Sequence, residues 1–356
     1  MRTFITGTGS YIPEQVRANR DFAGAEFYDR HRQRVAGDPT TIIEKFEQIT
    51  GIARRRYACP DMNTSDLAAL AARHAIADAG IDPETIDQLI VAHNFGDVSC
   101  NSAQSDAVPS LASRVKRLLA IHNPACIAYD LLFGCPGWLQ GLIQADAFIR
   151  AGLARKCLVI GAETLSRVID PYDRDSMIYS DGAGAVVLEE APFIHPGDAG
   201  ILGSISQTHA VEEAGYITLG ESYYPPGDNT RFLKMQGRKV YEFALRTIPA
   251  AMQACMESCK VEIGQLKKIF LHQANEKMDT AIVKAFYQLF GCHTIPDGIM
   301  PMNIRELGNS SVATIPTLLD MVRNALLPGH RLHPGDTVIF ASVGAGMNVN
   351  AVCYRF

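Results

Sequence analysis

The chain has 356 residues, of which 47% are hydrophobic and 20% charged, so it is neither a disordered chain nor a fibre. The 33 basic residues are outnumbered by 38 acidic ones, and the net charge of -5 excludes a general basic surface for nucleic acid or anionic lipid. The length suits two domains of about 150 to 200 residues that share a large interior.

No uninterrupted apolar run reaches the roughly 18 residues that a membrane helix needs. Residues 1–14 lack the basic region and the long apolar core of a secretory signal. We therefore expect a cytoplasmic protein that has neither a membrane nor a nucleic acid as a partner.

In chain order, short β-branched runs alternate with Ala-rich helical stretches. The predicted strands are 3–9, 88–94, 157–163, 185–190, 268–275 and 337–344, and the clearest predicted helices are 65–79 and 137–151. This alternation predicts an α/β fold built from layers of sheet and helix.

The sequence also repeats itself, and one offset is kept across three separated elements. At a shift of 180 residues the matches are 89–91 on 269–271, 158–160 on 338–340, and Pro136 on Pro316. Residues 181–184 match 343–346 at a shift of 162, which predicts 18 extra residues between Ala162 and Asp181. Chance seldom preserves an offset in this way, so we predict two homologous halves, 1–190 and 191–356.

The nine cysteines are spread singly and show none of the paired short spacings of a disulfide or zinc framework. We expect reduced thiols and no metal. Cys255 and Cys259 lie four residues apart on a predicted helix and can meet on one of its faces. Without a second pair of ligands, we interpret both as packing residues.

Cys135 differs from the other cysteines because it lies between a β-like run and a helical run. Pro136 suits the first turn of a helix, so Cys135 falls at or just before a helix N-terminus. There the free N–H groups and the helix dipole favour the thiolate. Gly134 and Gly137 allow backbone or substrate to approach closely. We predict that Cys135 is a nucleophile and that the other eight cysteines are structural.

His272 ends a predicted strand, and Asn309 lies in a polar turn that leads into a helix. Taken singly, such a His is more often structural and such an Asn is more often a helix cap. The repeat, however, carries the Asn309 loop to the second half's equivalent of the Cys135 loop. We expect the three side chains to share a pocket, with His272 and Asn309 as neutral hydrogen-bond donors to a thioester enolate.

Nearly the whole chain resembles the β-ketoacyl-acyl carrier protein synthase III family, which are condensing enzymes of the thiolase superfamily. The motifs that carry the resemblance are 7–14, 50–52, 130–141, 170–174, 181–184, 235–237, 272–275, 308–311 and 344–346. The resemblance implies a duplicated, five-layered αβαβα fold, a homodimer, an acyl carrier protein as partner, acyl thioesters as substrates, and no metal or redox cofactor.

The resemblance also implies a two-step acyl transfer. An acyl group moves from a thioester to Cys135, and a second thioester then loses carbon dioxide or a proton to give a carbanion that attacks it. In the family pattern His272 and Asn309 stabilise the enolate, and the backbone N–H groups of Cys135 and Ala345 form the oxyanion hole. Arg174 matches a position that binds coenzyme A, and Lys277 matches a basic position that helps to dock the carrier protein.

Several departures from the family pattern point away from the fatty-acid-initiating enzyme. Gly134 replaces the usual Ala, Pro136 replaces a small residue, and Ala345 interrupts the last glycine triplet. Residues 44–49 offer no counterpart to the Trp and Arg that grip the coenzyme A adenine. We therefore expect a specialised condensing enzyme that takes both chains from carrier proteins. A possible subgroup joins a β-ketoacyl chain to a second acyl chain, and the product cyclises to a dialkylresorcinol precursor.

Two stretches, 23–46 and 97–111, also look longer than in the basic family. The second would lie near the dimer interface and the acyl tunnel, where it reshapes a longer pocket or only decorates a surface loop.

Other functions stay open at the level of sequence. They are initiation from acyl-coenzyme A, acyl transfer to a hydroxyl or amine, and a non-catalytic partner subunit. The intact Cys, His and Asn argue against the last of these. A hydroxymethylglutaryl-type synthase is disfavoured because its acidic general base has no clear place.

Overall fold

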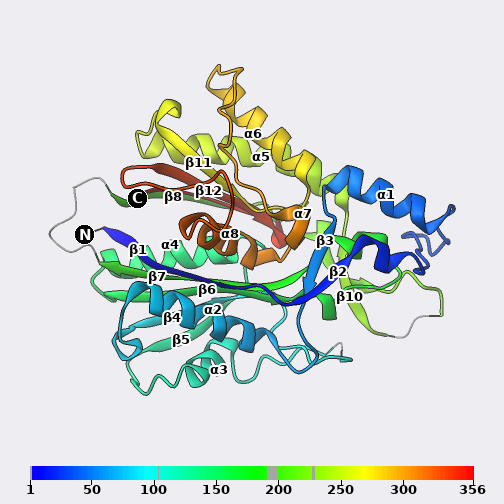
Figure 1. Cartoon of the computed structure of the whole chain (residues 1–356), viewed down its shortest axis with the longest axis horizontal. Helices are drawn as coiled ribbons and strands as arrows, with labels where there is room; N and C mark the ends of the chain where they lie inside the picture. The colour runs from blue at the N-terminus through cyan, green and yellow to red at the C-terminus, as the bar shows by residue number, and fades with distance from the viewer. Residues whose placement is uncertain (1, 103, 191–198, 227–228) are drawn as a thin grey trace.

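The computed structural model describes residues 2–102, 104–190, 199–226 and 229–356. Five layers alternate between helix and sheet, with a central helical layer between two sheets (Figure 1). This arrangement confirms the predicted five-layered α/β fold. No helix in these ranges is both long enough and apolar enough to cross a membrane.

The first sheet has the strand order β1-β7-β6-β4-β5, in which β4, β5 and β6 run parallel and the other pairs are antiparallel. Its strands are β1 Thr3–Tyr11, β4 Gln88–Ala92, β5 Ile127–Leu131, β6 Lys156–Thr164 and β7 Asp181–Glu190. The predicted strands of the first half are all present, and β5 is an addition at the edge.

The second sheet has the order β11-β12-β13-β8, in which only β11 and β12 are parallel. Its strands are β8 Gly200–Thr208, β11 Leu266–Leu271, β12 Thr337–Gly344 and β13 Asn348–Arg355. Two small antiparallel ribbons complete the strands: β2 Gln15–Ala18 with β3 Arg54–Tyr57, and β9 Ile217–Glu221 with β10 Arg231–Met235.

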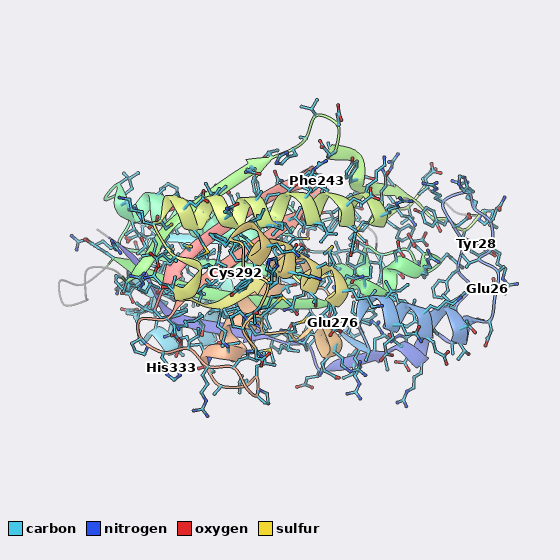
Figure 2. All side chains as sticks on the ribbon, turned by 90° about the horizontal axis from the view of Figure 1, so that it is seen from above. Glu26, Tyr28, Phe243, Glu276, Cys292 and His333 are labelled. Carbon is cyan, nitrogen blue, oxygen red and sulfur yellow. The ribbon has the colours of Figure 1, made fainter. Side chains whose placement is uncertain are left out.

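The helices cover both sheets and fill the space between them (Figure 1). They are α1 Pro39–Thr50, α2 Thr64–Ala79, α3 Leu111–Leu118, α4 Gly137–Arg150, α5 Gly237–Ser258, α6 Glu276–Leu289, α7 Ile304–Leu307 and α8 Thr314–Arg323. Helices α2 and α3 pack on the outer face of the first sheet, and α5 and α6 pack on the outer face of the second. Figure 2 shows α5 crossing that face, with Phe243 on it.

Helices α4 and α8 form the central layer, and their side chains join the inner faces of both sheets in one core. Trp138 on α4 meets Phe340 on β12 edge-to-face, with ring centroids 6.1 Å apart. Such burial of large apolar side chains is the main stabilising contribution to a layered fold. The packing of α4 and α8 therefore holds the two sheets together.

The hairpin registers correct one predicted alignment. Asp181, the first residue of β7, pairs with the last residue of β6, and Asn348, the first residue of β13, pairs with the last residue of β12. These two residues are thus equivalent, at a shift of 167 (348 minus 181), and the match of Asp181 to residue 343 is wrong. The Gly-Ala-Gly sequence at 182–184 lies at the start of strand β7, whereas the one at 344–346 ends strand β12 and forms the turn after it. The two segments therefore have similar sequences but different structures.

The connections between these strands differ by less than predicted. Residues 165–180 join β6 to β7 and residues 345–347 join β12 to β13, which is 16 against 3 residues, or 13 extra instead of 18. The predicted boundary at 190 borders residues 191–198, which lie outside the described part of the chain. The homology of the two halves stays a prediction.

Candidate active site

Cys135, His272 and Asn309, which are far apart in the sequence, line one pocket of about 290 Å³. Ala345 lines it as well. The rest of the wall is mainly apolar and includes Phe95, Leu165, Tyr179, Ile217, Leu219, Leu233, Met235, Val240, Met278 and Val343. No carboxylate is among the described lining residues, so the pocket suits an acyl chain and a neutral polar centre.

The nucleophile candidate lies directly before the central helix α4. Cys135 precedes Pro136, which takes the N-cap position, and the Gly137 N–H donates to the Gly134 carbonyl at 2.9 Å. This tight turn places Cys135 at the N-terminal end of α4, as the Pro136 signal indicates. The site therefore receives the positive end of the helix dipole.

Two glycine-containing loops pack backbone against backbone beside the thiol. Gly134 has a φ of +66°, and a Cβ there would lie 2.6 Å from the backbone nitrogen of Ala345. A Cβ on Gly344 would likewise overlap the backbone nitrogen of Cys135. Only glycine permits this approach, which brings together the two N–H groups expected to bind an oxyanion.

A chain of hydrogen bonds ends at the Cys135 sulfur. The Ser311 hydroxyl donates to Sγ at 3.3 Å, and the Asn94 amide nitrogen donates to the Ser311 hydroxyl oxygen at 3.1 Å. The same amide nitrogen donates to the Glu163 carboxylate. Because both Asn94 contacts are donations, the Ser311 proton is directed towards the sulfur.

The sequence reasoning missed Asn94, Glu163 and Ser311 as parts of the site. Asn94 and Glu163 lie where the neighbouring parallel strands β4 and β6 end, and polar residues at such ends meet at one edge of a sheet. Their positions at the ends of two predicted strands could therefore have identified Asn94 and Glu163 as candidate site residues. Ser311 has a φ of +52°, an uncommon conformation outside glycine that the sequence does not reveal.

The predicted thiolate preference of Cys135 meets an opposing effect in the structure. Burial raises the pKa of Cys135 to about 11, and the charge of Glu163 acts in the same direction. The hydrogen bond from Ser311 lowers it. Desolvation in the pocket therefore favours the thiol form of Cys135, whereas the helix N-terminus and the Ser311 donor favour the thiolate.

His272 follows β11 directly and is buried and neutral. Burial lowers the pKa of His272 to about 4, and a hydrogen bond with the Ser311 backbone acts in the opposite direction. Its Nδ1 atom is buried and has no hydrogen-bond partner among the described residues. A neutral imidazole in this position can donate to or accept from a ligand.

Asn309 is held in one orientation by the backbone around it. Its Oδ1 accepts a hydrogen bond from the Ser311 N–H at 2.8 Å, and its own N–H donates to the Ile178 carbonyl at 3.0 Å. The Ser180 N–H donates to the Asn309 carbonyl at 2.8 Å. With Oδ1 engaged, the amide nitrogen is the group that can donate into the pocket.

The ribbon of β9 and β10 forms one wall of the pocket and is held by a buried ion cluster. Lys234 Nζ lies 2.6 Å from an Asp170 oxygen and 3.1 Å from an Asp173 oxygen. The ammonium also lies 3.3 Å from the ring centroid of Tyr223. The long connection 165–180 therefore fixes the ribbon against the pocket, which assigns a structural role to the 170–174 motif.

Arg174 lies at a neighbouring hollow of about 500 Å³. This hollow shares four lining residues with the Cys135 pocket: Met235, Val240, Ala274 and Met278. Its charged lining residues are Lys45, Arg174 and Arg238 against the single acid Asp175. The excess of positive charge suits an anionic group that approaches the pocket from this side.

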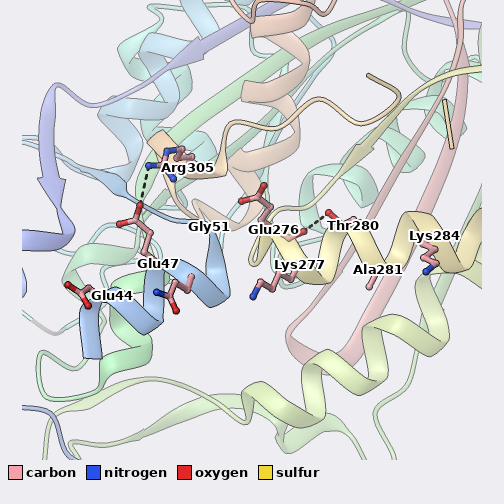
Figure 3. Close-up of a pocket in the computed structure, with 10 residues that line it drawn as sticks. Glu44, Glu47, Gly51, Glu276, Lys277, Thr280, Ala281, Lys284 and Arg305 are labelled. Atoms are coloured by element: carbon pink, nitrogen blue, oxygen red, sulfur yellow. Dashed lines mark hydrogen bonds and ion pairs between the residues drawn. The ribbon is translucent and has the colours of Figure 1, made fainter. Parts of the chain in front are cut away.

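Lys277 lies in a different hollow, of about 800 Å³, between α1 and the start of α6 (Figure 3). The charged residues that line it are Glu44, Glu47, Glu276, Lys277, Lys284 and Arg305. Arg305 is paired with Glu47 at 3.1 Å. Acids and bases are balanced here, so Lys277 does not belong to a uniformly basic surface.

The two long stretches do not contribute to the Cys135 pocket. Of the described residues in 97–111 and in 23–46, none lines it. Residue Asp97 is buried and anchored by Arg114 at 2.9 Å and by the Ser65 N–H at 2.8 Å. Asp97 thus ties the beginning of this stretch to the fold.

Comparison of the sequence with known proteins finds matches to one family. Residues 129–210 match the family model of 3-oxoacyl-[acyl-carrier-protein (ACP)] synthase III, and residues 256–356 match the model of its C-terminal part. The β-ketoacyl-[acyl-carrier-protein] synthase III of Synechococcus sp. (strain WH7803) is 33% identical, over 99% of this chain and 95% of that protein. The Paracoccus denitrificans (strain Pd 1222) protein of the same name is 33% identical, over 100% of this chain and 99% of that protein.

A solved structure agrees with the sequence matches. The crystal structure of β-ketoacyl-[acyl carrier protein] synthase III from Thermus thermophilus superposes with a TM-score of 0.79. It is 30% identical, and the match covers 99% of both chains. The similarity therefore extends over both sheets and over the loops that carry the site.

Proposed function

Because the chain belongs to the 3-oxoacyl-[acyl-carrier-protein] synthase III family, we propose that it joins two acyl thioesters by a carbon–carbon bond. One observation carries the proposal: Cys135, His272 and Asn309 surround a single apolar pocket that has no carboxylate among its described lining residues. A nucleophile and two neutral donors are the groups that acyl transfer and enolate formation require.

In the first step the Cys135 sulfur attacks the carbonyl carbon of an acyl thioester. The new carbon–sulfur bond forms as the bond to the donor's sulfur breaks, and the Cys135 proton leaves with the departing thiol. Negative charge collects on the carbonyl oxygen, where the N–H groups of Cys135 and Ala345 can donate to it. The Ser311 hydroxyl stabilises the thiolate that makes the attack.

In the second step another thioester loses carbon dioxide or a proton and becomes an enolate. The neutral His272 ring and the Asn309 amide nitrogen donate to the enolate oxygen, where the negative charge develops. The enolate carbon then attacks the acyl-enzyme carbonyl, a carbon–carbon bond forms, and the bond to the Cys135 sulfur breaks. The thiolate that leaves takes a proton from solvent.

We propose that both acyl chains arrive on carrier proteins through the Arg174 hollow. Its excess of positive charge suits a phosphate-bearing arm and an acidic carrier. On α1, the side chains at this hollow are aliphatic, basic, phenyl or hydroxyl: Ile42, Lys45, Phe46, Ile49 and Thr50. They lack the Trp and Arg pair that holds an adenine, which supports a specialised enzyme such as one that makes dialkylresorcinol precursors.

A homodimer that pairs through β5 is part of the proposal. In the described residues β5 pairs only with β4, so its other edge is open. Ile127 on β5 is 53% exposed, and Leu132 just beyond it is 66% exposed. An open sheet edge next to exposed apolar side chains favours association with a second copy.

The test is covalent loading measured by intact mass, with carrier-bound and coenzyme A-bound acyl chains of graded length. The expected result is an adduct on Cys135 from carrier-bound medium chains and none in Cys135→Ala. Ready acetyl loading from coenzyme A would instead indicate fatty-acid initiation. No adduct from any donor would contradict the enzyme assignment and favour a non-catalytic subunit.

A further inference from the structure

Three cysteine thiols meet beneath the C-terminal end of α5, away from the residues that line the Cys135 pocket. The Sγ atoms of Cys255, Cys259 and Cys353 all lie within 4.8 Å of one another. Cys255 lies in the last turn of α5, Cys259 is the C-cap of this helix, and Cys353 lies on β13, on the face that α5 covers. From the sequence, only Cys255 and Cys259 could be predicted to lie close together. Cys353 reaches them because α5 packs on the second sheet.

The backbone around these thiols is shaped to leave them room. A Cβ on Gly203 of β8 would lie 2.8 Å from the Cys259 sulfur, so any larger residue there would push this sulfur from its place. Gly203 pairs with Cys353, and the register of β8 and β13 shifts directly after this pair. A shifted register next to a glycine opens a sheet locally, which gives the sulfur atoms their space.

The surroundings also orient the individual sulfur atoms. The Cys255 thiol lies 3.5 Å from the Ala351 carbonyl oxygen and 3.7 Å from the Gly203 carbonyl oxygen. The Ser258 hydroxyl lies 3.8 Å from the Cys259 sulfur. Cys255 and Cys353 are fully buried, whereas Cys259 is partly exposed and gives access from solvent.

We propose that Cys255, Cys259 and Cys353 form a three-thiolate binding site for a soft monovalent cation, with Cu(I) as its probe. Metal–sulfur bonds of about 2.3 Å place three sulfur atoms roughly 4 Å apart around a trigonal ion. The three sulfur atoms are at most 4.8 Å apart, so small side-chain rotations can bring them to this spacing.

The ligand set selects against the commoner cations. Calcium and magnesium require oxygen ligands, and no carboxylate belongs to the cluster formed by the described residues. Structural zinc sites are four-coordinate, and here no fourth Cys, His, Asp or Glu joins the three within the described chain. Thiolates alone select soft ions such as Cu(I). This site is independent of the proposed condensation, because none of its residues lines the catalytic pocket.

The test is a titration of fully reduced, full-length protein with Cu(I) under anaerobic conditions, in competition with the chromogenic chelator bathocuproine disulfonate. Native mass spectrometry counts the ions per chain. We expect one retained Cu(I) per chain and a loss of affinity of about tenfold or more in Cys259→Ser. X-ray absorption of the wild-type complex is expected to show three sulfur neighbours.

Two controls separate this site from the other thiols. Cys292→Ser changes another partly buried cysteine, which lies beyond the end of α6 and outside the cluster (Figure 2). Cys135→Ala removes the nucleophile. Both variants are expected to bind Cu(I) like the wild type. The proposal is overturned if no ion survives the chelator, if Cys259→Ser binds normally, or if the bound ion has fewer than three sulfur neighbours. The X-ray absorption result needs no variant, so it decides the matter even where a substitution impairs folding.

Discussion

Replacing Ser311 by Ala removes the last donor of the chain that runs from Glu163 through Asn94 to the nucleophile. The Ser311 hydroxyl is 3.3 Å from the Cys135 sulfur and lowers the pKa of that thiol against the effect of burial. Without it, the pKa of Cys135 rises further above the wild-type value of about 11, and less thiolate is present at any given pH. We expect slower reaction of Cys135 with any electrophile.

The size of the effect follows from the hydrogen bond itself. A bond to a charged group contributes about 1.5–3 kcal/mol, and this bond belongs at the low end because its acceptor is a sulfur atom. About 1.4 kcal/mol corresponds to a tenfold change, so Ser311→Ala should slow alkylation about tenfold at fixed pH. The rate of alkylation is measured by labelling the protein with iodoacetamide at pH values from about 6 to about 9 and quantifying the Cys135 peptide by mass spectrometry.

The neighbouring serine supplies a matched control. The Ser310 hydroxyl lies 3.4 Å from the Thr314 hydroxyl and, unlike that of Ser311, is not hydrogen-bonded to Cys135 in the described structure, so Ser310→Ala should label at the wild-type rate. Ser311→Gly tolerates the positive φ of this position and separates backbone strain from the lost hydroxyl. If Ser311→Ala and Ser311→Gly label as fast as the wild type at every pH, the donor role of Ser311 is wrong.

Three further changes test other parts of the structure. His272→Ala should still form the acyl-enzyme, seen by intact mass, but should lose condensation by about 100-fold or more, because a donor to the enolate is gone; normal product formation would exclude its role. Lys234→Met leaves the buried Asp170 carboxylate without its cation, and thermal unfolding should show a loss of about 3–5 kcal/mol; an unchanged midpoint would mean that the cluster does not hold the β9–β10 ribbon. Burial raises the pKa of Asp279 well above its ordinary value, and its carboxylate oxygens have no hydrogen-bond partner among the described residues. The folded state therefore loses stability as the pH rises from about 4, where the unfolded chain ionises, so Asp279→Leu should raise the unfolding midpoint more at about pH 7.5 than at about pH 4.5. Equal gains at both pH values would refute this titration.

The order of strands and helices could be predicted from the sequence to a large extent. Residues 157–162, for example, form a continuous apolar run bounded by Lys156 and Glu163, and their burial on both faces is what a central strand requires. The helix before residue 80 has a capping box at Asn63 and ends at Gly80 in the left-handed conformation, so its limits are local. Local chemistry was sufficient for these elements.

The register between the two halves was not predictable in the same way. Residues 181–184 and 343–346 carry nearly the same letters, yet one begins a strand and the other ends a strand and turns. The hydrogen-bond partners across each hairpin decide which residues are equivalent, and those partners are distant in the sequence.

By itself, the sequence determined the layered α/β class, the family resemblance and the three candidate residues Cys135, His272 and Asn309. These could be determined because periodicity and local motifs depend only on residues that are close together in the sequence. Only the tertiary structure decided that the thiol is desolvated and that Ser311 donates to it. It also decided that Cys353 joins two thiols of a distant helix. The physical reason is that desolvation and directed contacts depend on which distant segments pack together, and no local pattern of residues specifies that packing.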